Sequence, residues 1–98
     1  MSDTALGPDA EVHPSVTIGG RDGPAPVIGR GATLRSGTII YPDVEIGDDF
    51  TTGHGALVRE GTTIGDGVLL GTQAVVDGHS TVGSDVSIQT GAYLPTKT

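Results

Sequence analysis

Apolar residues recur at every sixth position along most of this chain, and this spacing organises the whole sequence. The series runs from Ile28 to Leu94, and only Thr52 interrupts a succession of Ile, Leu and Val. The residue two positions before each member is small or apolar, so on an extended segment both side chains point to the same face. A period of six cannot keep one stripe on a helix of about 3.6 residues per turn. The pattern therefore predicts a series of short strands and no helix.

The 17 glycines mark bends between these strands and do not indicate a disordered chain. Most of them follow the apolar residue directly or stand three positions after it, where Asp is the common alternative. The second slot suits a corner with positive φ, which Gly tolerates freely and Asp adopts more readily than most residues. Because a single hexapeptide cannot bury its own apolar side chains, we expect the strands to coil and stack as a short-period solenoid.

This repeat resembles that of the hexapeptide-repeat family over about Val12 to Leu94, nearly the whole chain. The resemblance implies an all-β fold, a left-handed parallel β-helix solenoid of about five short coils with three hexapeptides in each coil. The handedness is taken from the family, since crossovers between parallel strands are otherwise almost always right-handed.

The coil boundaries follow from eighteen residues per coil. We expect complete coils at 28–45, 46–63 and 64–81, with a partial coil from 82. Residues 1–11 are expected to form an N-terminal cap on a solenoid of residues 12–98. The spacing between Ile18 and Ile28 exceeds the period by four residues, which predicts an inserted loop near 21–26.

Residues eighteen apart become stacked neighbours in such a solenoid, which sorts the outward side chains into columns. One column is apolar throughout and consists of Ile39, Leu57, Val75 and Tyr93. A continuous exposed apolar stripe is unusual on a monomer and favours an interface. Because family members are typically trimers, the resemblance implies a homotrimer through this side.

Three polar or aromatic residues accompany the apolar column on the same side of the coil. We expect Arg59 to pair with Asp77 and to stack on Tyr41.

The segment Gly53-His54-Gly55 is the leading candidate for chemistry. The stretch 52–67 resembles acyl-CoA-dependent acetyltransferases of the hexapeptide family, especially those acting on amino sugars or nucleotide sugars. The resemblance implies acetyl-CoA as co-substrate, His54 as general base, and Glu60 of a neighbouring copy as a group that orients the imidazole. Imidazole suits this task because its charge changes near neutral pH. The alternative is that both residues are solvated corner side chains.

A metal site deserves comparison, because the γ-class carbonic anhydrases share this fold and bind zinc through three histidines. His13, His54 and His79 share no column here and contain no close pair with ligand spacing. We therefore predict no metal site, and we interpret His13 and His79 as surface residues.

The net charge limits the classes of molecule that we expect this protein to bind. Twelve acidic residues against five basic ones give a formal charge of −7. Such a surface repels nucleic-acid phosphates and anionic lipids, so we expect neither nucleic acid nor a membrane as partner. No apolar run approaches the roughly 20 residues of a membrane-spanning helix, and no secretory signal is visible, which predicts a cytoplasmic protein.

The chain is shorter than the acetyltransferases it resembles, so it corresponds either to such an enzyme or to its truncated core. The alternative function is a non-catalytic trimeric or end-stacking β-solenoid module. The last strands, from Val82 to Leu94, would expose unpaired backbone groups, and we expect end-to-end association at this end. The sequence does not identify the acceptor substrate.

Overall fold

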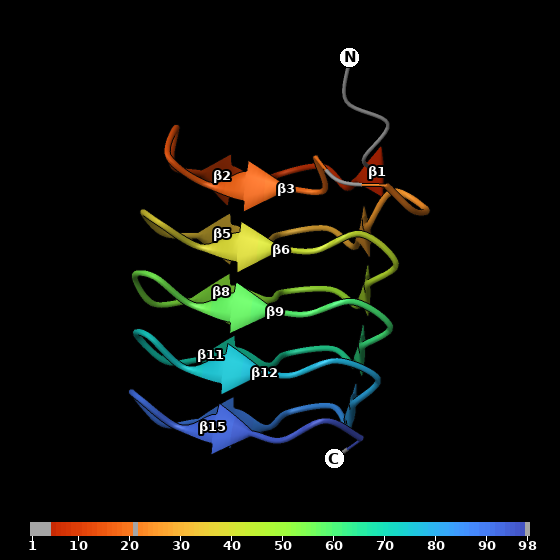
Figure 1. Ribbon diagram of the computed structural model, residues 1–98. Coiled ribbons are helices and arrows are strands. Elements are labelled where there is room, and N and C mark those ends of the chain that lie inside the picture. Colours follow the sequence, from red (N-terminus) through yellow and green to blue (C-terminus); the bar gives the residue numbers. More distant parts are fainter. Residues whose placement is uncertain (1–4, 21, 98) are drawn as a thin grey trace.

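The computed structural model describes residues 5–20 and 22–97 of the protein. Within these residues, 15 strands of two residues each follow one another along the chain, and no helix occurs. The strands form three parallel sheets of five strands each. Figure 1 shows the strands stacked in successive coils from the N-terminal end at the top to the C-terminal end at the bottom. The protein is a parallel β-solenoid of about five turns, as predicted.

Each sheet forms one side of the coil, and the chain passes from sheet A to sheet B to sheet C in every turn. Sheet A consists of β1 (Ala5–Leu6), β4 (Val27–Ile28), β7 (Glu45–Ile46), β10 (Thr63–Ile64) and β13 (Thr81–Val82). Sheet B consists of β2 (Glu11–Val12), β5 (Thr33–Leu34), β8 (Thr51–Thr52), β11 (Leu69–Leu70) and β14 (Ser87–Ile88). Sheet C consists of β3 (Thr17–Ile18), β6 (Ile39–Ile40), β9 (Leu57–Val58), β12 (Val75–Val76) and β15 (Tyr93–Leu94). The bends between them are the A–B, B–C and C–A corners.

The strand register confirms the coil of eighteen residues. Ile46 pairs with Ile28 on one side and with Ile64 on the other. The first coil is offset further, because Leu6 pairs with Ile28 and Ile18 pairs with Ile40. The extra residues lie between β3 and β4, where the inserted loop is expected. The loop is fixed to the next coil by a hydrogen bond of 2.7 Å from the Asp43 N–H to the Pro24 carbonyl. Arg21, within the expected loop, lies outside the described residues.

The N-terminal segment differs from the expected cap. Residues 1–4 lie outside the described part of the chain, but β1 and β2 fall within 1–11 and extend sheets A and B. The physical reason is visible in the sequence, because Leu6 stands six positions before Val12 and so continues the apolar series. From Ala5 onward, the described residues of the segment expected to form the cap therefore belong to the solenoid.

The sense of the coil follows from Figure 1. The front strands of sheet C run from left to right while the chain descends from the N-terminal to the C-terminal end. This is the left-handed sense, as the resemblance implied, and it departs from the usual right-handed rule for parallel crossovers.

The core is a column of stacked aliphatic side chains with polar exceptions at two corners. Every sixth residue from Ile28 to Ile88 is buried, and Phe50 and Thr52 are both fully enclosed. The corners adopt the positive φ that the Gly/Asp slot predicts. Among the described residues, seven other than glycine have this conformation, namely Asp9, Asp43, Asp49, Gln73, His79, Asp85 and Lys97. The repeat therefore accepts the local cost of left-handed backbone at non-glycine corners.

The outward column of sheet C is partly covered by its own neighbours. Ile39, Leu57 and Val75 stack on one another in register and are half-buried, whereas Tyr93 is 58% exposed. The stripe is therefore continuous along the sheet, but its central part is less exposed than the sequence pattern suggested.

Candidate functional site

His54 lies at the B–C corner of the third coil, between β8 and β9. The turn is formed with Gly55, whose φ is 69°. His54 itself does not need this conformation, because it occupies the preceding turn position. Its side chain is exposed and stands at the border of sheet C. The structure thus presents the imidazole at the surface beside the apolar stripe, where the sequence placed it.

A column of hydroxyl residues at this corner holds His54 from both sides. The Nδ1 atom of His54 lies 2.7 Å from Ser36 Oγ, one coil earlier. The His54 backbone N–H donates to Thr72 Oγ1, one coil later, at 3.2 Å. Gly53 allows this close stacking, because a Cβ there would lie 2.5 Å from the Thr72 backbone N. Ser36 and Thr72 were not singled out from the sequence, although their spacing of eighteen from His54 carries the signal.

A buried pair of threonines lies directly beneath the same corner. Thr38 and Thr52 are fully buried, and their hydroxyl oxygens are 2.9 Å apart. Thr52 also accepts a hydrogen bond of 3.1 Å from the Arg35 N–H, while Thr38 donates to the Gly53 carbonyl at 3.2 Å. No buried side-chain polar atom lacks a partner in the described residues. Thr52 is therefore bonded directly to the backbone of the residue before Ser36 and, through Thr38, to the backbone of the residue before His54.

His54 and Ser36 line one end of a groove of about 410 Å³ that runs along sheet B toward the first coil. The other polar residues of this groove include Arg35, Glu11 and His13. His13 was interpreted as a surface residue, and its side chain is indeed exposed. Its position in the same groove as His54 was missed, because the inserted loop changes the spacing between coils from 18 to 22 residues there.

The structure does not bring Glu60 to His54 within one chain. Glu60 lies at the C–A corner after β9, on the far side of sheet C from His54. Its Oε1 accepts a hydrogen bond of 3.0 Å from Arg59 Nε. The pKa of the Glu60 carboxyl lies below its ordinary value, chiefly because its own backbone N–H bonds to it and also because of Arg59. Glu60 is therefore an ionised, partly exposed partner of Arg59.

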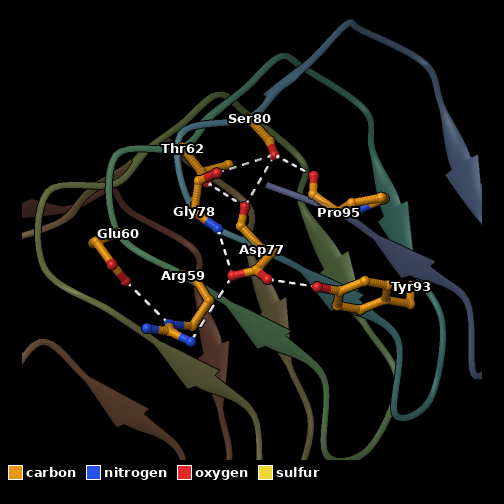
Figure 2. A network of polar contacts seen from close by, with 8 residues as sticks. All are labelled: Arg59, Glu60, Thr62, Asp77, Gly78, Ser80, Tyr93 and Pro95. Carbon is orange, nitrogen blue, oxygen red and sulfur yellow. Dashed lines mark hydrogen bonds and ion pairs between the residues drawn. The ribbon is translucent and has the colours of Figure 1, made fainter. Parts of the chain in front are cut away.

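Arg59 joins the residues on the C–A side of the stripe into a network (Figure 2). Its guanidinium carbon lies 4.6 Å from the centre of the Tyr41 ring, and its Nη1 lies 3.8 Å from Asp77 Oδ1. The expected pairing and stacking are both confirmed. The Tyr93 hydroxyl donates to Asp77 Oδ2 at 2.6 Å. This bond, followed by one from the Gly78 N–H, lowers the pKa of the Asp77 carboxyl.

Buried hydroxyls support this network from below. Thr62 Oγ1 donates to the Asp77 carbonyl at 3.2 Å, and Ser80 Oγ donates to the carbonyls of Asp77 and Pro95 at 3.0 and 3.3 Å. Figure 2 shows the Ser80 hydroxyl between the carbonyls of Asp77 and Pro95. The C–A corner is therefore a structural network that joins the last three coils.

His79 lies at the C–A corner one coil after Glu60. It adopts φ of 57°, the left-handed conformation of the Gly/Asp slot, and its N–H donates to the Glu60 carbonyl at 2.9 Å. Its ring lies over Gly61, where a Cβ would collide with it. His79 is exposed, which agrees with its interpretation as a surface residue.

The described residues as a set lack two further features. In these residues no group of three or more His, Asp or Glu side chains is arranged to hold a metal ion. The same residues contain no helix long and apolar enough to cross a membrane.

This chain was compared with protein-family models and with curated proteins. No protein-family model matches it, and no curated protein matches it either.

Proposed function

We propose that the protein is an acyl-CoA-dependent acetyltransferase of the hexapeptide-repeat type, or the core of one, acting on an amino sugar or nucleotide sugar. The observation that carries the proposal is the Ser36–His54 pair, whose atoms lie 2.7 Å apart at an exposed corner beside a groove. A volume of about 410 Å³ falls within the range of small-molecule sites, roughly 300–1,000 Å³. The hexapeptide repeat supports the proposed family, and the groove supports a binding site for a small molecule.

His54 acts as the general base in this proposal. When Ser36 Oγ accepts a hydrogen bond from the Nδ1–H of His54, the lone pair on Nε2 is free to take a proton. Acetyl-CoA as co-substrate supplies the acetyl group as a thioester. The acceptor nitrogen or oxygen bonds to the acetyl carbon and loses its proton to Nε2, and the C–S bond then breaks. The imidazolium returns the proton to the departing thiolate, so that protons and charges balance.

Ser36 is a positioning residue for this step. An imidazolium donates from both ring nitrogens, so the Ser36 oxygen accepts from Nδ1 throughout proton transfer. The corner beneath it is held by the buried Thr38–Thr52 bond of 2.9 Å. The imidazole is therefore oriented before any substrate binds, which is what general-base catalysis requires.

In this proposal, Glu60 reaches His54 only from a neighbouring copy of the chain. The corners that carry His54 and Glu60 border opposite edges of sheet C within one coil. A threefold axis parallel to the solenoid and facing sheet C would bring the His54 corner of one copy next to the Glu60 corner of the next copy. We propose this homotrimer, packed through Ile39, Leu57, Val75 and Tyr93, as the active form.

The test is acetyl transfer measured by release of the CoA thiol over a panel of amino sugars. His54→Gln should lower turnover by about 10²–10⁴-fold, the usual contribution of a general base. His79→Asn is the matched control, because Asn tolerates the left-handed corner and leaves the groove untouched. Absence of acetyl-CoA binding by calorimetry up to about 1 mM, which corresponds to roughly −4 kcal/mol, would reject the enzyme.

A second candidate function is a non-catalytic assembly module. The stacked, half-buried stripe on sheet C with Tyr93 58% exposed favours it. A stable oligomer that neither binds acetyl-CoA nor transfers acetyl groups would identify this function. End-to-end association through the strands of the last coil stays a prediction of the same candidate, and a concentration series by analytical ultracentrifugation measures it.

A further inference from the structure

The groove along sheet B brings together side chains that can bind an anion, although the protein as a whole is acidic. The chain carries a formal charge of −7. In contrast, Arg35 and two histidines, His13 and His54, line this one groove together with a single carboxylate, Glu11. The Arg35 guanidinium attracts an anion at short range even though the net charge of the molecule repels it, because screening limits long-range repulsion to about 8–10 Å at moderate salt.

Arg35 contributes to this groove a guanidinium that pairs with no carboxylate of the described residues. Arg30 pairs with Asp9 at 3.4 Å, and Arg59 pairs with Glu60 at 3.0 Å. Arg35 forms no ion pair with any residue of 5–20 or 22–97 and is exposed. Its backbone is fixed, since its N–H donates to buried Thr52 at 3.1 Å. A fixed backbone with an unpaired guanidinium is suited to bidentate recognition of an oxyanion.

Both imidazoles are held through Nδ1, which leaves Nε2 of each for a ligand. The Ser15 N–H donates to His13 Nδ1 at 3.0 Å, and Ser15 Oγ lies 2.8 Å from the same atom. Because Nδ1 accepts this backbone hydrogen bond, the neutral His13 carries its hydrogen on Nε2 and is a donor there. His54 Nδ1 lies 2.7 Å from Ser36 Oγ, and its Nε2 atom is a donor when Nδ1 accepts from the Ser36 hydroxyl and also when both ring nitrogens carry hydrogen.

We propose that this groove binds an oxyanion of the phosphate type, with Arg35 as the principal contact and the Nε2 atoms of His13 and His54 as further donors. The ligand is a phosphate or pyrophosphate group, either free or carried by a small molecule. The inference concerns binding alone and does not rest on the proposed acetyl transfer. A protein that binds the anion without turnover keeps this inference and loses the enzyme.

The experiment is an NMR titration of the ¹⁵N-labelled protein with inorganic pyrophosphate, observing the histidine ring nitrogens. We expect saturable shifts at His13 and His54 and none at His79. Arg35→Gln should weaken binding by about tenfold or more, as expected for loss of a charge-assisted contact. Arg30→Gln is the matched control, since Arg30 lies at the A–B corner and pairs with Asp9. The backbone spectrum verifies that each variant is folded.

The outcomes decide the proposal. Shifts that do not saturate by about 10 mM, or equal affinity in wild type and Arg35→Gln, would overturn it. If a nucleoside diphosphate binds more tightly than inorganic pyrophosphate, the group belongs to a nucleotide, and equal affinities indicate the free anion.

Discussion

Replacing Thr52 by Val tests how the corner beneath His54 is held. Thr52 has 0% exposure at a position where the repeat otherwise places Ile, Leu or Val. One arrangement uses every available hydrogen, with the Arg35 N–H donating to Thr52, Thr52 donating to Thr38, and Thr38 donating to the Gly53 carbonyl. The three donor–acceptor distances are 3.1, 2.9 and 3.2 Å.

The expected cost follows from what the substitution leaves behind. Thr52→Val preserves the shape of the side chain but leaves the Arg35 N–H without its partner and removes one of two bonds from Thr38. An unsatisfied donor of this kind costs about 1–3 kcal/mol, and the added methyl group recovers up to about 0.8 kcal/mol. We expect a net loss of about 1–2 kcal/mol in unfolding free energy. For a domain of this size each kcal/mol lowers Tm by roughly 4–8 °C.

Urea unfolding followed by circular dichroism provides the measurement. Thr51→Val is the matched control, because Thr51 is the outward neighbour in the same strand, and it should change stability by no more than about 0.5 kcal/mol. Thr38→Val combined with Thr52→Val should cost less than the sum of the single changes, since the two hydroxyls bond each other. A Thr52→Val protein as stable as wild type, with an unchanged m-value, would refute the hydrogen-bonded chain.

The remaining predictions concern the stacking of coils, the apolar stripe and the Asp77 network. Gly53→Ala should destabilise by about 1–3 kcal/mol because its Cβ would meet the Thr72 backbone, whereas Gly83→Ala, with open space at the same position, should be nearly neutral in thermal melts. Leu57→Asp should convert the oligomer to monomers in light scattering if sheet C is the interface, while Leu69→Asp on sheet B should leave it intact. Because the Asp77 carboxyl has a lowered pKa in the folded protein, it stabilises the fold above about pH 4 and loses this effect as the pH falls. Tyr93→Phe removes the main cause, so its urea midpoint should fall less than that of wild type between about pH 7 and pH 3.

Most of the fold is predictable from the sequence because each position of the hexapeptide repeat has one structural requirement. The sixth-residue series identified the inward side chains from Ile28 to Ile88, and the Gly/Asp slot identified the left-handed corners. The same rule would have assigned Leu6 to the first coil, but the four-residue insertion before Ile28 obscured the period. The described residues of the segment expected to form a cap instead extend sheets A and B.

The candidate site is predictable only in part, because it depends on which side chains from successive coils lie together at one corner. Reading eighteen residues in each direction from His54 gives Ser36 and Thr72, and both hydrogen-bond to it. The neighbourhood of His13 does not follow from this reading, since the spacing across the insertion is 22 residues. The pairing of Glu60 with Arg59 depends on side-chain geometry at another corner, which a column reading does not contain.

The repeat separates the position that shapes each corner from the position that can carry chemistry. The second turn residue must adopt positive φ, as Gly55 does at 69° and His79 does at 57°. The residue before it has no such restriction, so the column through His54 can hold Ser36 and Thr72 without changing the backbone. Parallel stacking then brings these side chains within hydrogen-bonding distance, at 2.7 Å for Ser36 and His54. A site that spans three coils can therefore arise by substitution at one slot of the repeat, while the aliphatic core beneath it is left unchanged.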